Sequence, residues 1–302
     1  MAKIAAGSAE TPLFFYNENH ALFGILHYPQ QKGNGMSLVF CHAFAEEQNI
    51  SHCIMTNFAR ELAACGYHVL RFDYMGCGDS SGEFGQATVA TRVSDILSSI
   101  EFLQKKTGLE KIGLLSLRLG AVFAALAAQK EPALAFLILC APIGDVKNYL
   151  WQLLRSNLAA QMVIYGEIRC DREQLLQHLM LGQMINIDGY DLSKEFYNQA
   201  MDIDLTDALG QFARPVLIVD ISEKARPMDR ELLRATQLRG QGNAIEVIQV
   251  TEPPFWIEPK VFVARAEQLY AKTIQWLRHR DGLYATEALR LHGISVPIRE
   301  GQ

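Results

Sequence analysis

The sequence lacks several features that mark particular classes of protein. It has no run of about eighteen apolar residues, which argues against a membrane-spanning helix. Its opening, MAKIAAGSAE, is too short and too weakly apolar for a secretory signal. The net charge is −5, so there is no excess of basic residues to attract nucleic acid. We therefore expect a cytoplasmic protein that neither spans a membrane nor binds nucleic acid.

Paired cysteines are also lacking. The six cysteines form no CxxC pair, and no Cys/His cluster has the spacing of metal ligands. Most of them lie inside apolar runs, where reduced and buried thiols are more common than disulfides in a cytosolic protein. The sequence predicts neither a metal site nor a bound cofactor.

What is present is an alternation of strands and helices. Continuous apolar runs such as GMSLVFCH, HVLRFDY, KIGLLSL and ALAFLILCAP predict buried strands, and helical spacing separates several of them. A hairpin with its turn at residues 17–19 precedes them. The first helix is expected to have Ser51 as its N-cap and to end at Gly66, and a second to cover residues 87–106. This order predicts an α/β protein with a mostly parallel sheet covered on both faces.

The alternation of strands and helices stops after the fourth of these apolar runs. Residues 144–206 are mostly helical in pattern, without a convincing strand, and we interpret them as an inserted lid. The α/β pattern resumes with the strand RPVLIVDI, a helix near DRELLRATQL, the strand AIEVIQV and a final helix that ends at HR. The predicted core therefore comprises residues 1–143 and 207–281, and residues 282–302 are expected to form a loosely attached tail.

Three motifs lie at strand ends of this pattern: FCHAFAEEQNIS, FDYMGCGDSSGEF and SLRLGA. In that order they resemble the α/β-hydrolase fold, specifically its serine aminopeptidase-like branch with a helical lid between the sixth and seventh strands. The resemblance covers residues 12–280. It implies that the first motif supplies an oxyanion-hole amide, that the second is the Asp–x–x–Gly–x–Gly–x–Ser loop after the fourth strand, and that SLRLGA is the nucleophile elbow.

Four short strings suggest a narrower relationship. SLRLGA, APIGDVKNYLWQLLR, IDGYDLS and PPFWIE resemble the hydrolase-like proteins associated with the exosortase A system, encoded beside bacterial exopolysaccharide genes. This resemblance implies a role in a pathway linked to exopolysaccharide export.

The elbow itself departs from the hydrolase pattern. A nucleophile elbow needs small residues two positions before and after the nucleophile, and Ser116 and Gly120 occupy these positions around Arg118. A guanidinium cannot act as the nucleophile because it stays protonated at neutral pH. Ser116 is a weak alternative, since Leu114 and Arg118 on its two sides are large and it would lie inside the strand. We interpret it as the small residue that lets the elbow close.

The other two members of a Ser–His–acid triad are also missing by position. The place of the acid falls near Lys224, while Asp220 lies nearer the end of its strand. The loop TEPPFWIEP, where the histidine belongs, has none, and no histidine occurs between His178 and His279. We interpret His279 as a solvated charge at a helix end. The nucleophile needs its base and the base its orienting acid, so the sequence predicts a degenerate triad.

The remaining parts of the site would suit an anion. Arg118 is expected at a helix N-terminus, beside the amides of Leu119 and Phe44 that correspond to the oxyanion hole. His42 is expected to order its turn by hydrogen bonds, and Trp256 forms a wall of the pocket or packs the final helix. The alternative is internal neutralisation of the guanidinium, because an unpaired buried charge is costly. The candidate partners for this ion pair are Glu46, Glu47, Glu223 and Glu258.

Two further assignments concern neighbouring residues. Asp79 follows Gly78 and is expected to stabilise its loop. Cys41 and Cys140 lie near strand ends, but no adjacent residue would clearly lower the pKa of either thiol, so we do not expect them to be nucleophiles.

Three functions remain open from the sequence. The first is a non-catalytic hydrolase homologue that binds a small acidic or acyl-containing ligand, or a protein partner. The second is an active hydrolase of ester, thioester or amide bonds that uses non-standard residues. In one version, Glu46 or Glu258 activates water and Arg118 is the electrophile. The third is a structural protein whose lid surface binds a partner.

Overall fold

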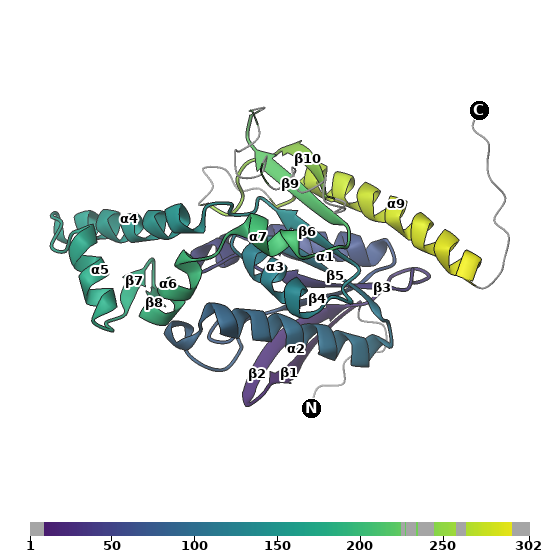
Figure 1. Cartoon of the computed structure of the whole chain (residues 1–302), viewed down its shortest axis with the longest axis horizontal. Coiled ribbons are helices and arrows are strands. Elements are labelled where there is room, and N and C mark those ends of the chain that lie inside the picture. The colour runs from purple at the N-terminus through teal and green to yellow at the C-terminus, as the bar shows by residue number, and fades with distance from the viewer. Residues whose placement is uncertain (1–8, 225–226, 228–233, 235–244, 258–263, 292–302) are drawn as a thin grey trace.

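The computed structural model describes residues 9–224, 227, 234, 245–257 and 264–291. These form an eight-stranded sheet with helices on both faces and a helical insertion that projects to one side (Figure 1). The strand order is β1-β2-β4-β3-β5-β6-β9-β10. The strands are β1 (Glu10–Asn17), β2 (His20–His27), β3 (Met36–Cys41), β4 (His68–Phe72), β5 (Lys111–Leu117), β6 (Phe136–Cys140), β9 (Val216–Ser222) and β10 (Ile245–Thr251).

The sheet is mixed at one edge and parallel elsewhere. β1 and β2 form the predicted hairpin, with Asn17 opposite His20, and β2 runs antiparallel to β4. All other neighbouring pairs in this sheet are parallel. The predicted α/β fold with a mostly parallel sheet is therefore confirmed.

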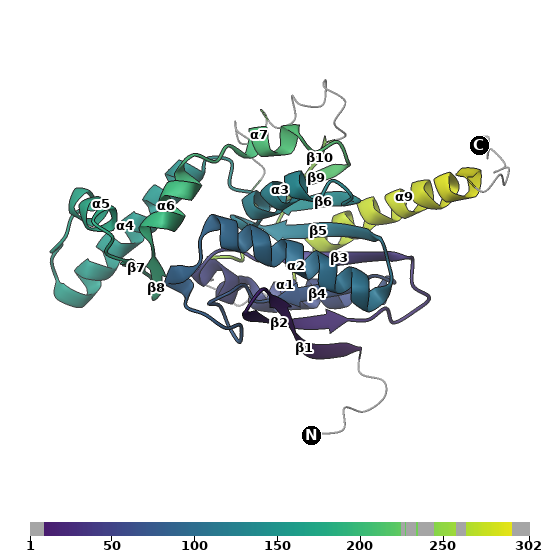
Figure 2. The ribbon, with the colours of Figure 1, turned by 60° about the horizontal axis from the view of Figure 1, so that its bottom comes forward.

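Helices cover both faces of the sheet, which explains the continuous apolar runs of the strands. α2 (Val89–Thr107) and α3 (Gly120–Lys130) pack on one face, and α1 (Glu46–Ala64) and α9 (Glu267–Leu291) on the other (Figure 2). Along β5, Leu114 belongs to the first layer of the core, whereas Leu115 and Leu117 belong to the second. The predicted stripe of α2 is buried: Val89, Val93, Ile96, Ile100 and Leu103.

The predicted N-cap of α1 is wrong. The helix begins at Glu46, and Ser51 lies buried inside it with its hydroxyl donating to the Glu47 carbonyl oxygen at 2.6 Å. Ala45, with φ of 53°, leads directly from the turn after β3 into the helix. Two acidic residues in the first turn favour this start through the helix dipole. At the other end, Gly66 follows the helix with φ of 99°, as the predicted stop requires.

The segment between β6 and β9 is helical but also contains a small hairpin. Its helices are α4 (Val146–Tyr165), α5 (Arg172–Met180), α6 (Lys194–Met201) and α7 (Leu205–Gly210). The expectation that it holds no strand is wrong, because β7 (Ile185–Ile187) and β8 (Tyr190–Leu192) pair antiparallel. The turn between them places Asp188 at φ 50° and Gly189 at φ 94°. Asp-Gly is a strong signal for such a turn, but strands of three residues are too short to show a period.

The C-terminal part differs from the prediction at both ends of its helix. α9 begins at Glu267 and continues to Leu291, past the predicted start of the tail at residue 282. The helix predicted near DRELLRATQL falls almost wholly outside the described residues. None of the helices in the described ranges combines the length and apolar character needed to cross a bilayer.

Candidate functional site

The turn between β5 and α3 has the geometry of an elbow. Arg118 follows the strand with φ of 56°, a left-handed conformation that non-glycine residues rarely adopt. Its amide donates to the Cys140 carbonyl oxygen at 3.0 Å, which ties the turn to β6. A Cβ on Gly120 would lie 2.2 Å from the His42 carbonyl oxygen, so only glycine fits where the helix starts. The strained residue at the tip of the elbow is therefore an arginine.

Ser116 lies in the interior of the sheet. Its side chain is fully buried in β5, and its hydroxyl donates to the Ile138 carbonyl oxygen at 3.0 Å. It does not line the cavity described below. This placement supports its interpretation as a small residue under the elbow.

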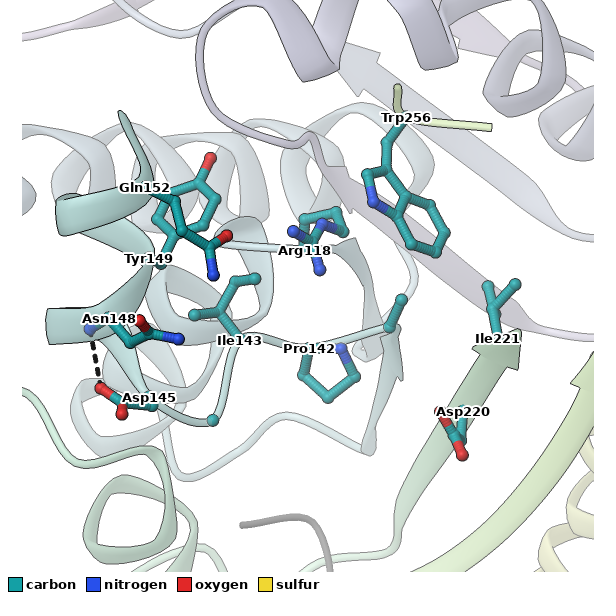
Figure 3. A pocket seen from close by; sticks show the side chains of 12 residues that line it. Arg118, Pro142, Ile143, Asp145, Asn148, Tyr149, Gln152, Asp220, Ile221 and Trp256 are labelled. Carbon is teal, nitrogen blue, oxygen red and sulfur yellow. Dashed lines mark hydrogen bonds between the residues drawn. The ribbon is translucent and has the colours of Figure 1, made fainter. Parts of the chain in front are cut away.

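The Arg118 guanidinium is held by an acid and two aromatic rings. Its Nε and Nη2 atoms donate to Glu47 Oε1 at 3.2 and 3.1 Å. Its Cζ lies 4.9 Å from the centroid of the Trp256 ring and 5.8 Å from that of Tyr149, and Figure 3 shows it between these two side chains. The side chain is 18% exposed. Arg118 is thus both ion-paired and partly open to solvent.

Glu47 is the acid that neutralises Arg118 among the four candidates. Glu46 instead accepts from Asn49 Nδ2 and Tyr190 Oη, both at 3.3 Å. Glu223 is exposed, and Glu258 lies outside the described residues. Sequence alone could not choose among them, because the pairing joins residues that are far apart in the chain.

The ion pair is formed at a desolvated position. Burial raises the pKa of Glu47, and the charge of Arg118 and its hydrogen bond oppose this rise. The Tyr149 side chain is buried beside the Glu47 carboxylate. Burial followed by the charge of Glu47 raises the pKa of Tyr149. Burying two charges costs several kcal/mol per ion, so this pair is weak evidence for stability.

A cavity of about 250 Å³ opens beside Arg118. Figure 3 shows its floor and walls, which come from the ends of β6 and β9, the start of α4 and the loop that carries Trp256. Of the sequence-predicted site residues, Arg118 and Trp256 line it, whereas Leu119, Phe44 and His42 do not. The remaining lining residues are Ala141, Pro142, Ile143, Gly144, Asp145, Asn148, Tyr149, Gln152, Asp220 and Ile221.

The polar lining from α4 was missed by sequence reasoning. The Asp145 carboxylate caps α4 by accepting from the backbone N–H of Asn148 at 2.8 Å. This hydrogen bond fixes the first turn of α4 beside the cavity. Tyr149 and Gln152 follow one turn further on. The string APIGDVKNYLWQLLR did hold a signal for this helix start, because Asp145 is a favourable N-cap residue directly before a helical pattern.

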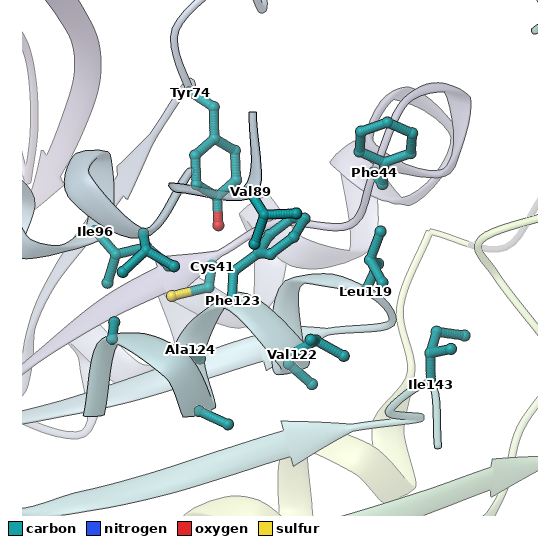
Figure 4. Packing of buried hydrophobic residues seen from close by; sticks show 14 of the residues in the cluster. Cys41, Phe44, Tyr74, Val89, Ile96, Leu119, Val122, Phe123, Ala124 and Ile143 are labelled. Atoms are coloured by element: carbon teal, nitrogen blue, oxygen red, sulfur yellow. The ribbon is translucent and has the colours of Figure 1, made fainter. Parts of the chain in front are cut away.

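The side of the elbow that carries Phe44 and Leu119 is packed. The Phe44 ring stacks on Phe196 of α6 with centroids 4.6 Å apart, and Phe84 lies 5.1 Å away. Leu119 is fully buried, and Figure 4 shows it beside α3 with Phe123 and Phe44. The aromatic side chains therefore fill this side of the elbow, and the described cavity lies on the other.

His42 is buried and neutral. Burial, with smaller contributions from Arg71 and His52, lowers its pKa to about 3. The Nδ1 atom has no hydrogen-bond partner among the described residues, so the expected ordering of the turn by hydrogen bonds is not found at this atom. The ring instead packs edge-on against Phe40, with centroids 6.4 Å apart.

The glycine-rich loop after β4 is organised by Asp73 rather than Asp79. The Asp73 carboxylate accepts from Gln48 Nε2 at 3.1 Å and from the Asp79 amide at 3.3 Å. Ser80 donates its hydroxyl to the Asp73 carbonyl oxygen at 2.5 Å. Asp79 itself is exposed and takes part only through its backbone. A Cβ on Gly78 would lie 2.1 Å from Asp73 Oδ2, which explains the glycine.

The other candidate groups are not placed as nucleophile, base or metal ligands. Burial raises the pKa of Cys140 to about 12 and that of Cys41 further, so both thiols stay protonated at neutral pH. Asp220 is buried in β9, lines the cavity and accepts from Gln249 Nε2 at 3.1 Å. Lys224 and His279 are exposed. Within the described ranges, no group of three His, Cys, Asp or Glu side chains could hold a metal ion.

Comparison with known sequences supports the three-motif assignment. Residues 35–183 match the family described as "Serine aminopeptidase, S33". All three motifs lie within these residues. An uncharacterized 31.7 kDa protein in the traX-finO intergenic region of Escherichia coli is 31% identical over 113 residues. That match covers 36% of this chain and 38% of the relative, so the chain spans well under two thirds of the relative's length.

Solved structures share the fold over most of the chain. Est1E from Butyrivibrio proteoclasticus, solved with ferulic acid bound, has a TM-score of 0.58 and 20% identity, covering 79% of this chain and 88% of its own. The Pyrococcus furiosus esterase Pf2001 has a TM-score of 0.59 and 15% identity, covering 89% of this chain and 91% of its own. At these identities the likeness concerns the fold. Residues 35–183, just under half of the chain, match the serine aminopeptidase family, and the described residues share the fold of these two esterases.

Proposed function

We propose that this protein binds a small carboxylate- or phosphate-bearing ligand beside Arg118 and does not use a Ser–His–acid mechanism. The observation that carries the proposal is the guanidinium at the tip of the elbow, set between Tyr149 and Trp256 on the wall of a cavity of about 250 Å³. Arg118 is the cationic side chain among the lining residues, which also include Asp145 and Asp220, so the carboxylate or phosphate of a ligand would bind at its guanidinium.

The hydrogen bonds of Arg118 leave room for a ligand. Glu47 accepts from Nε and Nη2, and Nη1 has no hydrogen bond to any described residue. An anionic ligand can therefore bind Nη1 while the ion pair persists, or replace Glu47 outright. The raised pKa of Glu47 is compatible with replacement, because a carboxyl that loses its cationic partner can take up a proton and so leave no unpaired charge buried.

The lining of the cavity favours an aromatic or acyl-bearing acid. The rings of Trp256 and Tyr149 flank the cation and offer flat apolar surfaces to such a ligand. Amide groups of Asn148 and Gln152 supply neutral hydrogen-bond donors and acceptors. Because the structural neighbour Est1E binds ferulic acid, ferulate is a reasonable probe of this preference.

Hydrolysis by unconventional residues is the competing function. In one version of this function, Glu46 or Glu258 is the base that activates water. Glu46 does not line the cavity and is bound to Asn49 and Tyr190, and Glu258 lies outside the described residues. The contacts of Glu46 argue against it as this base. The narrower link to the exosortase system rests on short sequence strings and stays a prediction.

Calorimetric titration tests the proposal directly. We expect ferulate to bind the intact protein and its neutral methyl ester to bind at least tenfold more weakly, because a hydrogen bond to a charged group contributes about 1.5–3 kcal/mol. Arg118→Gln is expected to lower ferulate affinity by about tenfold or more. Arg214→Gln, which removes an exposed arginine outside the cavity lining, is the matched control and should bind normally.

Two results would contradict the proposal. Equal affinity for the acid and its ester, or unchanged binding by Arg118→Gln, would show that the guanidinium is only a structural ion pair. Turnover of p-nitrophenyl esters or thioesters that is abolished by Arg118→Gln, with thermal stability retained, would establish the competing hydrolase.

A further inference from the structure

The C-terminal end of α4 exposes a cluster of large apolar side chains, here called the α4 tip. Val163 is 86% exposed, Ile164 68%, Ile168 50%, and Met162 and Tyr165 48% each. Gly166, with φ of 73°, ends the helix directly after these residues. Isolated apolar residues on a surface are ordinary, but five within seven positions form a contiguous feature that calls for a partner.

The arrangement of the tip indicates what kind of partner fits. Residues 162–165 are consecutive in a helix, so their side chains point in directions about 100° apart and together surround the axis. A protein partner or a neighbouring sheet covers one stripe of a helix. The end of α4 is apolar on every side except where Arg169 stacks on Tyr165, and a medium that encloses a helix end, such as the interfacial region of a lipid bilayer, matches it.

The tip is also placed where a broad surface can reach it. In both Figure 1 and Figure 2, the end of α4 lies with α5 on the side of the molecule farthest from the sheet. The four residues rise along the helix axis by about 6 Å at 1.5 Å per residue. That length is comparable to the depth of about 5–10 Å at which apolar side chains reach the boundary between headgroups and acyl chains.

Positive and negative charges around the tip are balanced, so the tip has no net charge to attract it to anionic lipids. Between residues 155 and 173 the sequence has three arginines and three acidic residues. Arg169 stacks on the Tyr165 ring at 3.9 Å and pairs with Glu167 at 3.4 Å, so charge next to the apolar cluster is neutralised locally. An amphipathic surface drawn by anionic headgroups has an excess of Lys and Arg instead.

We propose that the α4 tip inserts Met162, Val163, Ile164, Tyr165 and Ile168 into the interfacial region of a lipid bilayer. Zwitterionic lipid is sufficient, because the driving force is burial of apolar surface. The protein then binds a membrane surface reversibly through the α4 tip, whether or not the cavity at Arg118 holds a ligand.

Vesicle flotation with the full-length protein tests this. The protein is expected to float with phosphatidylcholine vesicles, and added salt should leave this binding nearly unchanged. Val163→Glu and Ile164→Glu should each weaken it by about tenfold or more, the equivalent of losing the burial of one large apolar side chain. Tyr16→Glu is the matched control, since Tyr16 on β1 is 69% exposed, close to the 68% of Ile164.

Tryptophan fluorescence provides a second measurement, which reports whether the α4 tip itself enters the bilayer. Val163→Trp should show a blue-shifted emission on phosphatidylcholine vesicles and none without them. Flotation that requires phosphatidylglycerol and is lost in salt would overturn apolar insertion. So would a stable dimer that Val163→Glu dissociates and that fails to float, because a second copy of the chain would then be the occupant.

Discussion

At the residue scale, Gly120 shows what the elbow requires. A Cβ there would lie 2.2 Å from the His42 carbonyl oxygen and 2.5 Å from that of Cys41, and backbone atoms cannot move aside as a flexible side chain does. We predict that Gly120→Ala destabilises the protein by roughly 2–4 kcal/mol, at or above the usual cost of overpacking. Urea unfolding measures the change. Gly33→Ala, whose Cβ would have no neighbour closer than 3.8 Å, should change stability by less than about 0.5 kcal/mol, and equal effects would contradict the proposed crowding.

The same scale shows what the sequence could predict about the site. Arg118 was identifiable because local spacing, with Ser116 before it and Gly120 after it, marks an elbow whatever stands between them. The choice of Glu47 as its partner was not, since Glu46 is adjacent and the helix direction decides which carboxylate faces the turn. Asp73 was missed in favour of Asp79 for a similar reason: its carboxylate folds back across the loop to accept an amide six residues later.

At the scale of elements, a stack of two phenylalanines joins the insertion to the core. Phe196 of α6 is 2% exposed, stacks on Phe44 and lies 6.3 Å from the Phe123 ring of α3. We predict that Phe196→Ala costs about 3–5 kcal/mol, the usual range for removing a buried phenylalanine. It should also raise hydrogen exchange in residues 144–206 more than in the sheet, because the insertion loses its contact with the elbow.

Phe14→Ala provides the control for this prediction. Phe14 is 56% exposed on β1 and contacts the Phe23 ring at 5.4 Å, so its removal should cost less than about 1 kcal/mol. Uniform exchange in Phe196→Ala, with the insertion no more affected than the sheet, would show that the insertion is docked by other contacts.

Elements differed in how well they could be predicted. Long periodic segments such as α2 and the buried strands matched expectation, because burial on one or both faces leaves a clear apolar period. The three-residue strands β7 and β8 left no period. The predicted start of α1 was too late in the chain, because the true N-cap residue, Ala45, has no capping side chain. Ser51, inside the helix, offered a stronger local signal.

At the scale of the whole molecule, buried neutral histidines tie stability to pH. The pKa of His42 is lowered to about 3 and that of His27 to about 4, mainly by burial, from an ordinary value of 6.5. As the pH falls below 6.5, the unfolded chain binds protons at these residues before the folded protein does. Their contribution to stability is therefore complete above pH 6.5 and is lost progressively toward the folded pKa values. Buried carboxyls with raised pKa values, such as Asp73 and Asp95, act in the opposite sense.

A difference between variants isolates the histidine contribution from that of the carboxyls. Between about pH 6 and pH 4, His42 should contribute a slope of about 1.4 kcal/mol of unfolding free energy per pH unit. We predict that His42→Gln flattens the pH dependence of stability by that amount, as measured by urea unfolding at several pH values. His279→Gln removes an exposed histidine and should leave the slope unchanged. If both variants kept the slope of the original protein, His42 would have to take up a proton in the folded state as readily as in the unfolded chain. Its environment would then be hydrated rather than closed beneath the elbow.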